Sequence, residues 1–154
     1  MRNLQRFLFV LAGALTLALS LAPRAAEVNA ADGLALKGHD PVAYFNAGKP
    51  VRGLDALRLE HAGTAYLFAT PENRDAFKAD PARYLPQYGG YCAFGVSRGY
   101  KADIDPAAFT VVDGKLYLNY NAAVQRDWLK DPAGYIRAAD GKWSEVKGTT
   151  KVYR

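Results

Sequence analysis

The pattern of apolar and polar residues in the first half of the chain predicts a β-hairpin followed by a helix. Leu57 and Leu59 alternate with charged residues, so they lie on one face of a strand. Residues 64–68 are rich in β-forming side chains and predict the return strand. Thr70 and Pro71 are typical of a helix start, because the hydroxyl accepts hydrogen bonds from free N–H groups and proline fits the first helical position.

The second half of the chain repeats this succession. Residues 109–112 and 115–120 predict two strands around Asp113-Gly114, a two-residue turn in which both positions tolerate positive φ. A helix is predicted over residues 121–129, and a last helix over residues 131–141, where a glycine ends it. Each hairpin is therefore expected to precede helices that can cover it.

Segments 58–84 and 109–135 match each other at a constant offset of 51 residues, without a gap. The matched pairs are Gly63 and Gly114, Tyr66 and Tyr117, Leu67 and Leu118, Phe77 and Trp128, Asp80-Pro81-Ala82 and Asp131-Pro132-Ala133, and Tyr84 and Tyr135. A constant offset indicates a repeated supersecondary unit. We therefore predict an α+β fold with an internal pseudo-repeat, in which a small antiparallel sheet formed from the two hairpins packs with short helices.

The stretch Gly89–Ser97 joins the two matching segments and holds Cys92, the one cysteine of the chain. Gly89-Gly90 permits positive φ and a sharp turn. A helix that begins at Tyr91 or Cys92 would place the sulfur near free N–H groups, which favour the nucleophilic thiolate form. The alternative is a small buried apolar side chain, because free cysteine is among the most buried residue types.

Residues 1–30 have the pattern of a secretory signal peptide. Two arginines precede an uncharged apolar run from Phe7 to Ala22, whose 16 residues are short for a membrane span, which needs about 20. Small residues at positions −3 and −1 predict cleavage after Ala30. We expect a periplasmic or secreted protein without stable membrane insertion; the alternative is an N-terminal membrane anchor.

Cleavage there would leave residues 31–154, a length of 124 residues that suits one domain over 31–146 and a basic, flexible tail over 147–154. The mature protein would carry 17 basic and 14 acidic residues, a net charge of +3 against +5 for the whole chain. Outside the tail the basic residues are scattered along the sequence. We therefore predict no nucleic-acid binding.

Three further segments carry a family resemblance. They are Gly38-His39-Asp40-Pro41-Val42-Ala43-Tyr44-Phe45, the residues Gly63, Tyr66-Leu67-Phe68, Glu72-Asn73, Phe77, Asp80-Pro81 and Tyr84, and the stretch Gln87-Tyr88-Gly89-Gly90-Tyr91-Cys92-Ala93-Phe94-Gly95-Val96. Together they resemble the exported YHS-domain proteins of bacteria, over residues 34–145. The resemblance implies a small α+β domain with a metal-binding role, because YHS domains occur beside metal-transporting and metal-using modules.

The resemblance also bears on individual positions. Metal-binding members of the family carry cysteines where this chain has His39-Asp40-Pro41 and Ala69-Thr70. Some members carry selenocysteine at the place that aligns with Cys92, which implies redox chemistry there.

Cys92 and His39 are the candidate metal ligands, because thiolate and imidazole bind transition metals. One cysteine and two histidines are too few for a closed zinc site of four such ligands. The sequence leaves the cofactor open, with copper or another transition metal in a lower-coordinate site as the candidate. The alternative for His39 is a capping or solvated side chain. Four tyrosines outside the repeat crowd the same stretches and are expected to line a pocket: Tyr44, Tyr88, Tyr91 and Tyr100.

These residues predict a YHS-type module that binds a small ligand or a metal ion in a pocket between the two repeats. Cys92 would be the anchor, with His39, Asp40, Tyr91 and Tyr44 around it. The sequence contains no nucleophile-plus-base motif, P-loop or dinucleotide-binding loop, so no catalytic residue is predicted. Two alternatives stay open: a redox protein in which the Cys92 thiolate reacts with peroxide or a partner disulfide, and a structural or interaction domain with an inert thiol.

Overall fold

The computed structural model describes residues 26–31 and 33–154, so most of the predicted signal peptide lies outside the described residues. The elements are β1 (Ala30–Ala31), β2 (Leu34–Ala35), η1 (Leu36–Gly38), α1 (Ala43–Asn46), β3 (Leu54–His61), β4 (Thr64–Phe68), α2 (Pro71–Ala79), α3 (Pro81–Tyr84), η2 (Gln87–Gly90), α4 (Ala93–Ser97), β5 (Lys101–Ala102), β6 (Phe109–Val112), β7 (Lys115–Leu118), α5 (Ala122–Trp128), α6 (Pro132–Val146) and β8 (Val152–Tyr153). This mixture of helices and small sheets is the α+β fold predicted from the sequence. Within the described ranges, every helix is too short or too polar to cross a bilayer.

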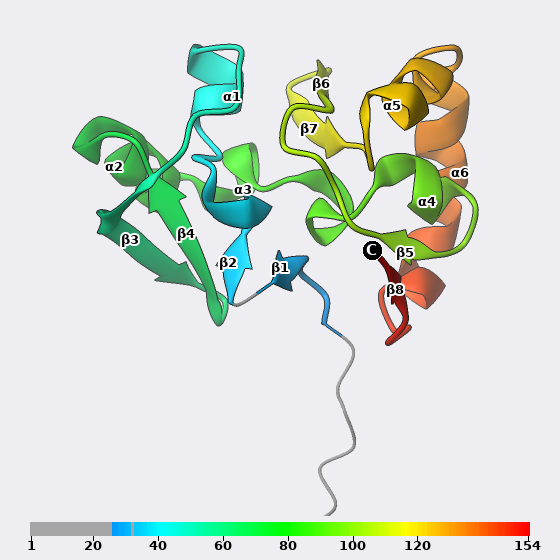
Figure 1. Ribbon diagram of the computed structural model, residues 1–154, viewed down its shortest axis with the longest axis horizontal. Helices are drawn as coiled ribbons and strands as arrows, with labels where there is room; N and C mark the ends of the chain where they lie inside the picture. Colours follow the sequence, from blue (N-terminus) through cyan, green and yellow to red (C-terminus); the bar gives the residue numbers. More distant parts are fainter. Residues whose placement is uncertain (1–25, 32) are drawn as a thin grey trace, which may run out of the picture.

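The two predicted hairpins form, but they belong to different sheets. Figure 1 shows β3 and β4 on one side of the molecule and β6 and β7 on the other. The first sheet has the strand order β1-β2-β4-β3, and β6-β7 is a sheet of its own. The expectation of one sheet made from both hairpins is therefore wrong. The reason is that β2 occupies the free edge of β4, with Leu34 opposite Ala65 in parallel register.

Both hairpin turns have the backbone that their sequences predict. Ala62 and Gly63 have φ values of +49° and +77°, and Asp113 and Gly114 have φ values of +50° and +72°. Two consecutive positive φ values match the right-handed twist of the flanking strands. Asp113 is well suited to this conformation, whereas Ala62 has a Cβ that disfavours it.

Helix starts also follow the sequence. The Thr70 hydroxyl accepts from the Asn73 backbone N–H (3.1 Å) at the start of α2. The Asn121 side chain accepts from the Val124 N–H (2.9 Å) at the start of α5. Each cap satisfies one of the free N–H groups of its helix, which explains why these helices begin where the sequence predicts.

The last helix is longer than predicted. The sequence places its end at Gly141, but α6 continues to Val146. Its buried positions Ala139 and Val146 pack with the apolar cluster around α4. Burial of this face offsets the cost of one glycine in a helix interior, which is about 1 kcal/mol.

Three apolar clusters form the core. The first half holds Ala35, Val42, Tyr66, Phe68 and Phe77, and the second half holds Tyr88, Tyr91, Ala93, Val96, Tyr117, Trp128, Ala139 and Val146. A third cluster joins the halves through Leu36, Tyr44, Cys92, Ala102, Ile104, Leu116 and Leu118. Cys92 is therefore part of the packing between the two halves.

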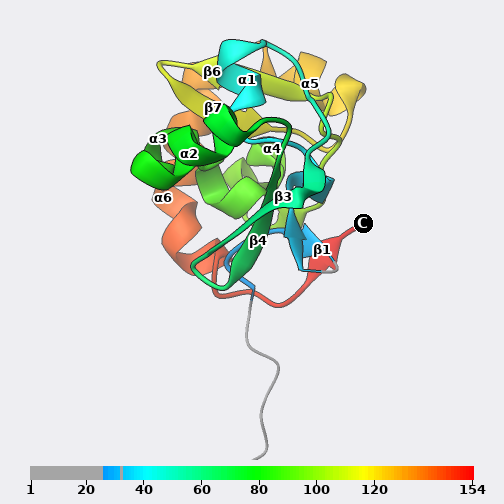
Figure 2. The same ribbon diagram turned by 90° about the vertical axis from the view of Figure 1, so that its left-hand side faces the viewer.

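The segment 26–29 and the C-terminal residues both contact the second half of the molecule. Strand β8 pairs in parallel with β5, so residues 147–154 contain a strand where the sequence predicts a flexible tail. Figure 2 shows β1 and the C-terminus on the same side of the molecule. A buried lysine, Lys101, connects these segments: its Nζ donates to the carbonyl oxygens of Ala26 (2.8 Å), Lys147 (2.8 Å) and Thr149 (2.7 Å).

Candidate functional site

Cys92 is held rigidly by its backbone. It directly precedes α4, its N–H donates to the Ala102 carbonyl (3.0 Å), and its own carbonyl accepts from the Val96 N–H (3.0 Å). A bridge to Leu118 in β7 fixes the other side. The side chain is only 1% exposed, so it is buried, as one of the two sequence-based interpretations expected.

The chain bends sharply just before Cys92, and this bend depends on Gly89 and Gly90. Gly89 and Gly90 have φ values of +61° and +77°, in the region that favours glycine. A Cβ on Gly89 would also collide with the Glu27 carbonyl, because the N-terminal segment crosses the bend there. The Asn29 N–H donates to the Gly89 carbonyl (2.8 Å), which ties the segment to the bend.

Among the residues that the structure describes, the sulfur of Cys92 has one hydrogen-bond partner, Asn119. The Asn119 Nδ2 lies 3.9 Å from the sulfur and donates to it. The Asn119 side chain is fully buried, and its Oδ1 has no hydrogen-bond partner among residues 26–31 and 33–154. Asn119 follows β7 directly, and the sequence analysis did not select it. An asparagine inside the apolar run Leu116-Tyr117-Leu118-Asn119-Tyr120 was the available signal.

A pocket of about 410 Å³ opens beside the sulfur. Its lining residues come from α4, β5, α5, β8 and the loops between them: Cys92, Phe94, Tyr100, Ala102, Tyr120, Val124 and Tyr153. Three of these rings are 38–48% exposed, namely Tyr100, Tyr120 and Tyr153, so the pocket has an aromatic mouth. Tyr100 and Tyr153 meet edge to face, with 5.1 Å between ring centroids.

The pocket differs in place and composition from the predicted one. It lies within the second half of the chain, not between the two hairpin units, although Cys92 itself packs at their junction. Of the four tyrosines expected to line it, Tyr100 does so. The other three are engaged elsewhere: burial raises the pKa of Tyr44, whose hydroxyl donates to the Pro106 carbonyl (3.2 Å), and the hydroxyls of Tyr88 and Tyr91 donate to Asp140 (2.8 Å) and Ala26 (2.9 Å).

The Asp40 side chain bonds other parts of the protein instead of facing the pocket. Its carboxylate is fully buried and accepts four hydrogen bonds, from the N–H groups of Val42 (2.8 Å), Ala43 (3.3 Å) and Ala69 (2.8 Å) and from the Asn73 side chain (2.7 Å). Val42 and Ala43 are the residues at which α1 begins, so the carboxylate stabilises the start of this helix. Asp40 is not among the residues that line the Cys92 pocket.

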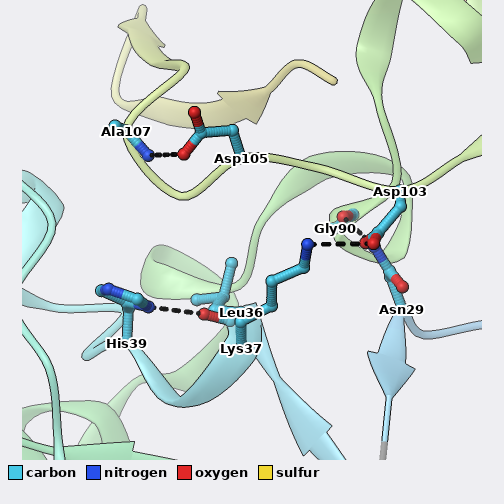
Figure 3. A network of polar contacts seen from close by, with 8 residues as sticks. All are labelled: Asn29, Leu36, Lys37, His39, Gly90, Asp103, Asp105 and Ala107. Carbon is cyan, nitrogen blue, oxygen red and sulfur yellow. Dashed lines mark hydrogen bonds and ion pairs between the residues drawn. The ribbon is translucent and has the colours of Figure 1, made fainter. Parts of the chain in front are cut away.

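His39 also lies outside the pocket lining. Figure 3 shows its ring beside Leu36, where Nδ1 is 3.0 Å from the Leu36 carbonyl oxygen. In the described part of the chain, no three His, Cys, Asp or Glu side chains come together to hold a metal ion. The lower-coordinate copper site on Cys92 and His39 therefore stays a prediction, whereas the pocket is a feature of the structure.

No protein-family model, no curated protein and no solved structure matches this chain.

Proposed function

We propose that this chain is an exported, YHS-type module that binds a small molecule in the Cys92 pocket. The observation that carries the proposal is the pocket of about 410 Å³ with the one cysteine in its wall. Ligand sites in proteins typically enclose 300–1,000 Å³ and combine apolar walls with a few polar groups. The wall of this pocket is mainly apolar and aromatic, and Cys92 and three tyrosines are the lining residues whose side chains carry a polar atom.

The unpaired Asn119 oxygen supports a binding role. A buried acceptor without a partner costs about 1–3 kcal/mol, and proteins retain such groups mainly where they serve a purpose. An apolar residue of similar size at position 119 would avoid this cost. Asn119 instead keeps an acceptor without a partner among the described residues, next to the sulfur of the pocket residue Cys92.

We also propose that the two halves are copies of one unit, as the 51-residue offset predicts. Supporting this, Tyr66 packs on Phe77 with ring centroids 5.0 Å apart and 34° between planes, and Tyr117 packs on Trp128 at 5.5 Å and 34°. The two hairpin turns share positive φ at both central residues, and the helix that follows each hairpin has a side-chain cap. The copies differ in length, because the last helix extends only in the second.

Asp40 in the first half and Cys92 in the second half differ in how fully the protein satisfies their side chains. Asp40 and Cys92 each precede a short helix and each contact the residue directly after a return strand, Ala69 or Asn119. Four donors satisfy the Asp40 carboxylate, so this side chain has no need of a ligand. Among the described residues Cys92 has one side-chain partner, and it lines a pocket, so a ligand can bind next to it.

Export remains part of the proposal, with a changed cleavage position. Cutting after Ala30 would remove Ala26 and Asn29, which bond Lys101, Gly89, Gly90 and Asp103. We therefore propose that the mature chain keeps these residues and that cleavage falls before Ala26. The intact mass of the protein purified from the periplasm tests this: a chain beginning at Ala31 would contradict it.

Binding is tested with 2-naphthaleneethanol, a neutral aromatic probe, followed by ¹⁵N–¹H correlation spectra. The probe is expected to shift the amides of Cys92, Phe94 and Ala102 in the natural protein. Val124→Trp fills the pocket from α5 and should abolish these shifts, whereas Ala123→Trp places the same ring on the exposed neighbour and should leave them. Absence of shifts in the natural protein, or equal shifts in both variants, would overturn the proposed site.

The redox alternative has its own test. With 1% exposure, the Cys92 sulfur is reachable only through the pocket. A thiol reagent of small size should therefore react more slowly with Val124→Trp than with Ala123→Trp if the pocket admits it. Resistance of the natural folded protein to every such reagent would favour the inert thiol.

A further inference from the structure

Two cations stand over aromatic rings of the pocket wall. The Arg98 guanidinium carbon is 4.9 Å from the centroid of the Phe94 ring, and the Lys151 Nζ is 4.5 Å from the centroid of the Tyr153 ring. Both rings line the pocket and both cationic side chains belong to exposed residues. Cation–π contacts of this kind hold the charges close to the pocket.

These charges are not neutralised by neighbouring carboxylates. Among residues 26–31 and 33–154, neither Arg98 nor Lys151 takes part in an ion pair, and no Asp or Glu lines the pocket. Two carboxylates lie in the loop between β5 and β6, and Figure 3 shows their partners. Asp103 pairs with Lys37 (2.9 Å), and Asp105 accepts from the Ala107 N–H (2.9 Å). The electrostatic potential next to the pocket is therefore expected to be positive.

The fold fixes the position of Lys151. Strand β8 is in register with β5, with Val152 opposite Lys101 and Tyr153 opposite Ala102, a pocket residue. The Lys101 ammonium also holds the carbonyl of Thr149, two residues before Lys151. The cation and the ring beneath it are thus parts of one ordered segment.

We propose that the ligand of the pocket is a small anion with an aromatic or apolar body, of the class of aromatic carboxylates. Its body lies against the apolar wall of Phe94, Ala102 and Val124, and its charge stays in the solvated region near Arg98 and Lys151. This inference rests on the proposed function, because it specifies the ligand of the same site.

Three probes with one aromatic body test the charge preference: 2-naphthylacetate (anion), 2-naphthaleneethanol (neutral) and 2-(2-naphthyl)ethylammonium (cation). The natural protein should bind the anion about 5-fold more tightly than the alcohol, which corresponds to about 1 kcal/mol, and the cation least tightly. The preference should shrink in 0.5 M salt, where charges are strongly screened. Titration of pocket amides by NMR gives the three dissociation constants.

Variants separate this inference from the proposed function. Arg98→Gln with Lys151→Gln should bring the three affinities within about 2-fold of one another while affinity for the neutral alcohol is kept. Lys49→Gln with Lys78→Gln removes the same charge from exposed residues of the first half and should leave the anion preference unchanged. Equal affinities in the natural protein, or an unchanged preference in the Arg98 and Lys151 variant, overturn the inference alone. Absence of binding by all three probes overturns the proposed function as well.

Discussion

The side-chain amide of Asn119 donates a hydrogen bond to the sulfur of Cys92 across 3.9 Å, in a fully buried position. The two residues are 27 positions apart in the sequence. Their contact joins the end of β7 to the start of α4, and the pocket opens next to it. The polar surroundings of the Cys92 sulfur therefore include this amide, whose Oδ1 has no partner among the described residues.

Asn119 is expected to tolerate an apolar substitution better than a charged one. Asn119→Leu keeps the branched outline and removes the unpaired acceptor. Relief of that acceptor offsets the tighter packing of the larger methyl groups, so the free energy of unfolding should change by less than about 1.5 kcal/mol. Asn119→Asp places a carboxylate in the same buried site and should cost about 3 kcal/mol at pH 7, with a smaller loss at pH 4, where the carboxyl is protonated. Urea denaturation at both pH values measures this. Equal stability of the two variants at pH 7 would contradict the buried position of the amide.

Substitutions at Gly89 and Gly48 test whether residues 26–29 pack against the bend before Cys92. Both have positive φ, +61° and +63°, but only Gly89 faces the Glu27 carbonyl, while Gly48 has open space around its Cβ position. Gly48→Ala should cost about 1 kcal/mol through backbone strain, and Gly89→Ala about 3 kcal/mol because strain and collision add. In a chain that begins at Ala31 the two losses should become equal. Equal losses in the longer chain would argue against the packing of residues 26–29.

Lys101 is expected to hold the C-terminal strand. Lys101→Met removes the donor of three carbonyls, and burial lowers the pKa of this lysine. The Asp103 N–H, which donates to the Tyr153 carbonyl (2.8 Å), should exchange with solvent at least 10-fold faster.

The control for this effect is Lys142→Met. Lys142 also donates to a carbonyl, that of Ser97 (2.8 Å), but it does not contact the tail. Exchange at Asp103 should stay within about 2-fold of the natural protein in this variant. Similar acceleration in both variants would mean that Lys101 has no special part in holding β8.

Alkaline pH should destabilise the protein through its buried tyrosines. Burial raises the pKa of Tyr66 to about 12 from 10.0, and burial likewise raises the pKa of Tyr117. The folded state therefore keeps a phenolic proton that the unfolded chain releases. The resulting stability is present below pH 10 and is lost as pH rises from 10 to 12.

Tyr66→Phe isolates this contribution. The natural protein should lose about 1 kcal/mol more than Tyr66→Phe between pH 9.5 and 11, while the two differ little in slope below pH 9. Urea denaturation across this range gives the difference. Parallel stability curves from pH 9 to 11 would show that Tyr66 ionises as freely in the folded protein as in the unfolded chain.

Much of the local structure could be predicted because its causes lie within a few residues. The Asp113-Gly114 turn and the Thr70 and Asn121 caps depend on short-range hydrogen bonds and φ preferences. The end of α6 could not be predicted in the same way. Its extension beyond Gly141 depends on packing with the cluster around α4, more than 40 residues away in sequence.

The same difference between short-range and long-range causes applies to the candidate site. The sequence selected Cys92 by its type and by the paired glycines before it, and Tyr100 as a residue near a pocket. It did not select Asn119, Tyr120 or Tyr153, because these reach the sulfur or its pocket only after β7, α5 and the tail have been placed. His39 and Asp40 were selected by sequence neighbourhood, but their hydrogen bonds are directed to Leu36 and to the start of α1.

What the sequence by itself determined is the succession of hairpins, caps and turns, and the presence of a single thiol between two matching segments. These features follow from backbone preferences and from hydrogen bonds between near neighbours. Only the tertiary structure decided that the hairpins occupy separate sheets, that the last residues form a strand, and that a pocket with cations beside it opens at the sulfur. Such contacts join residues that are dozens of positions apart, and a two-residue strand such as β8 leaves no periodic pattern in the sequence.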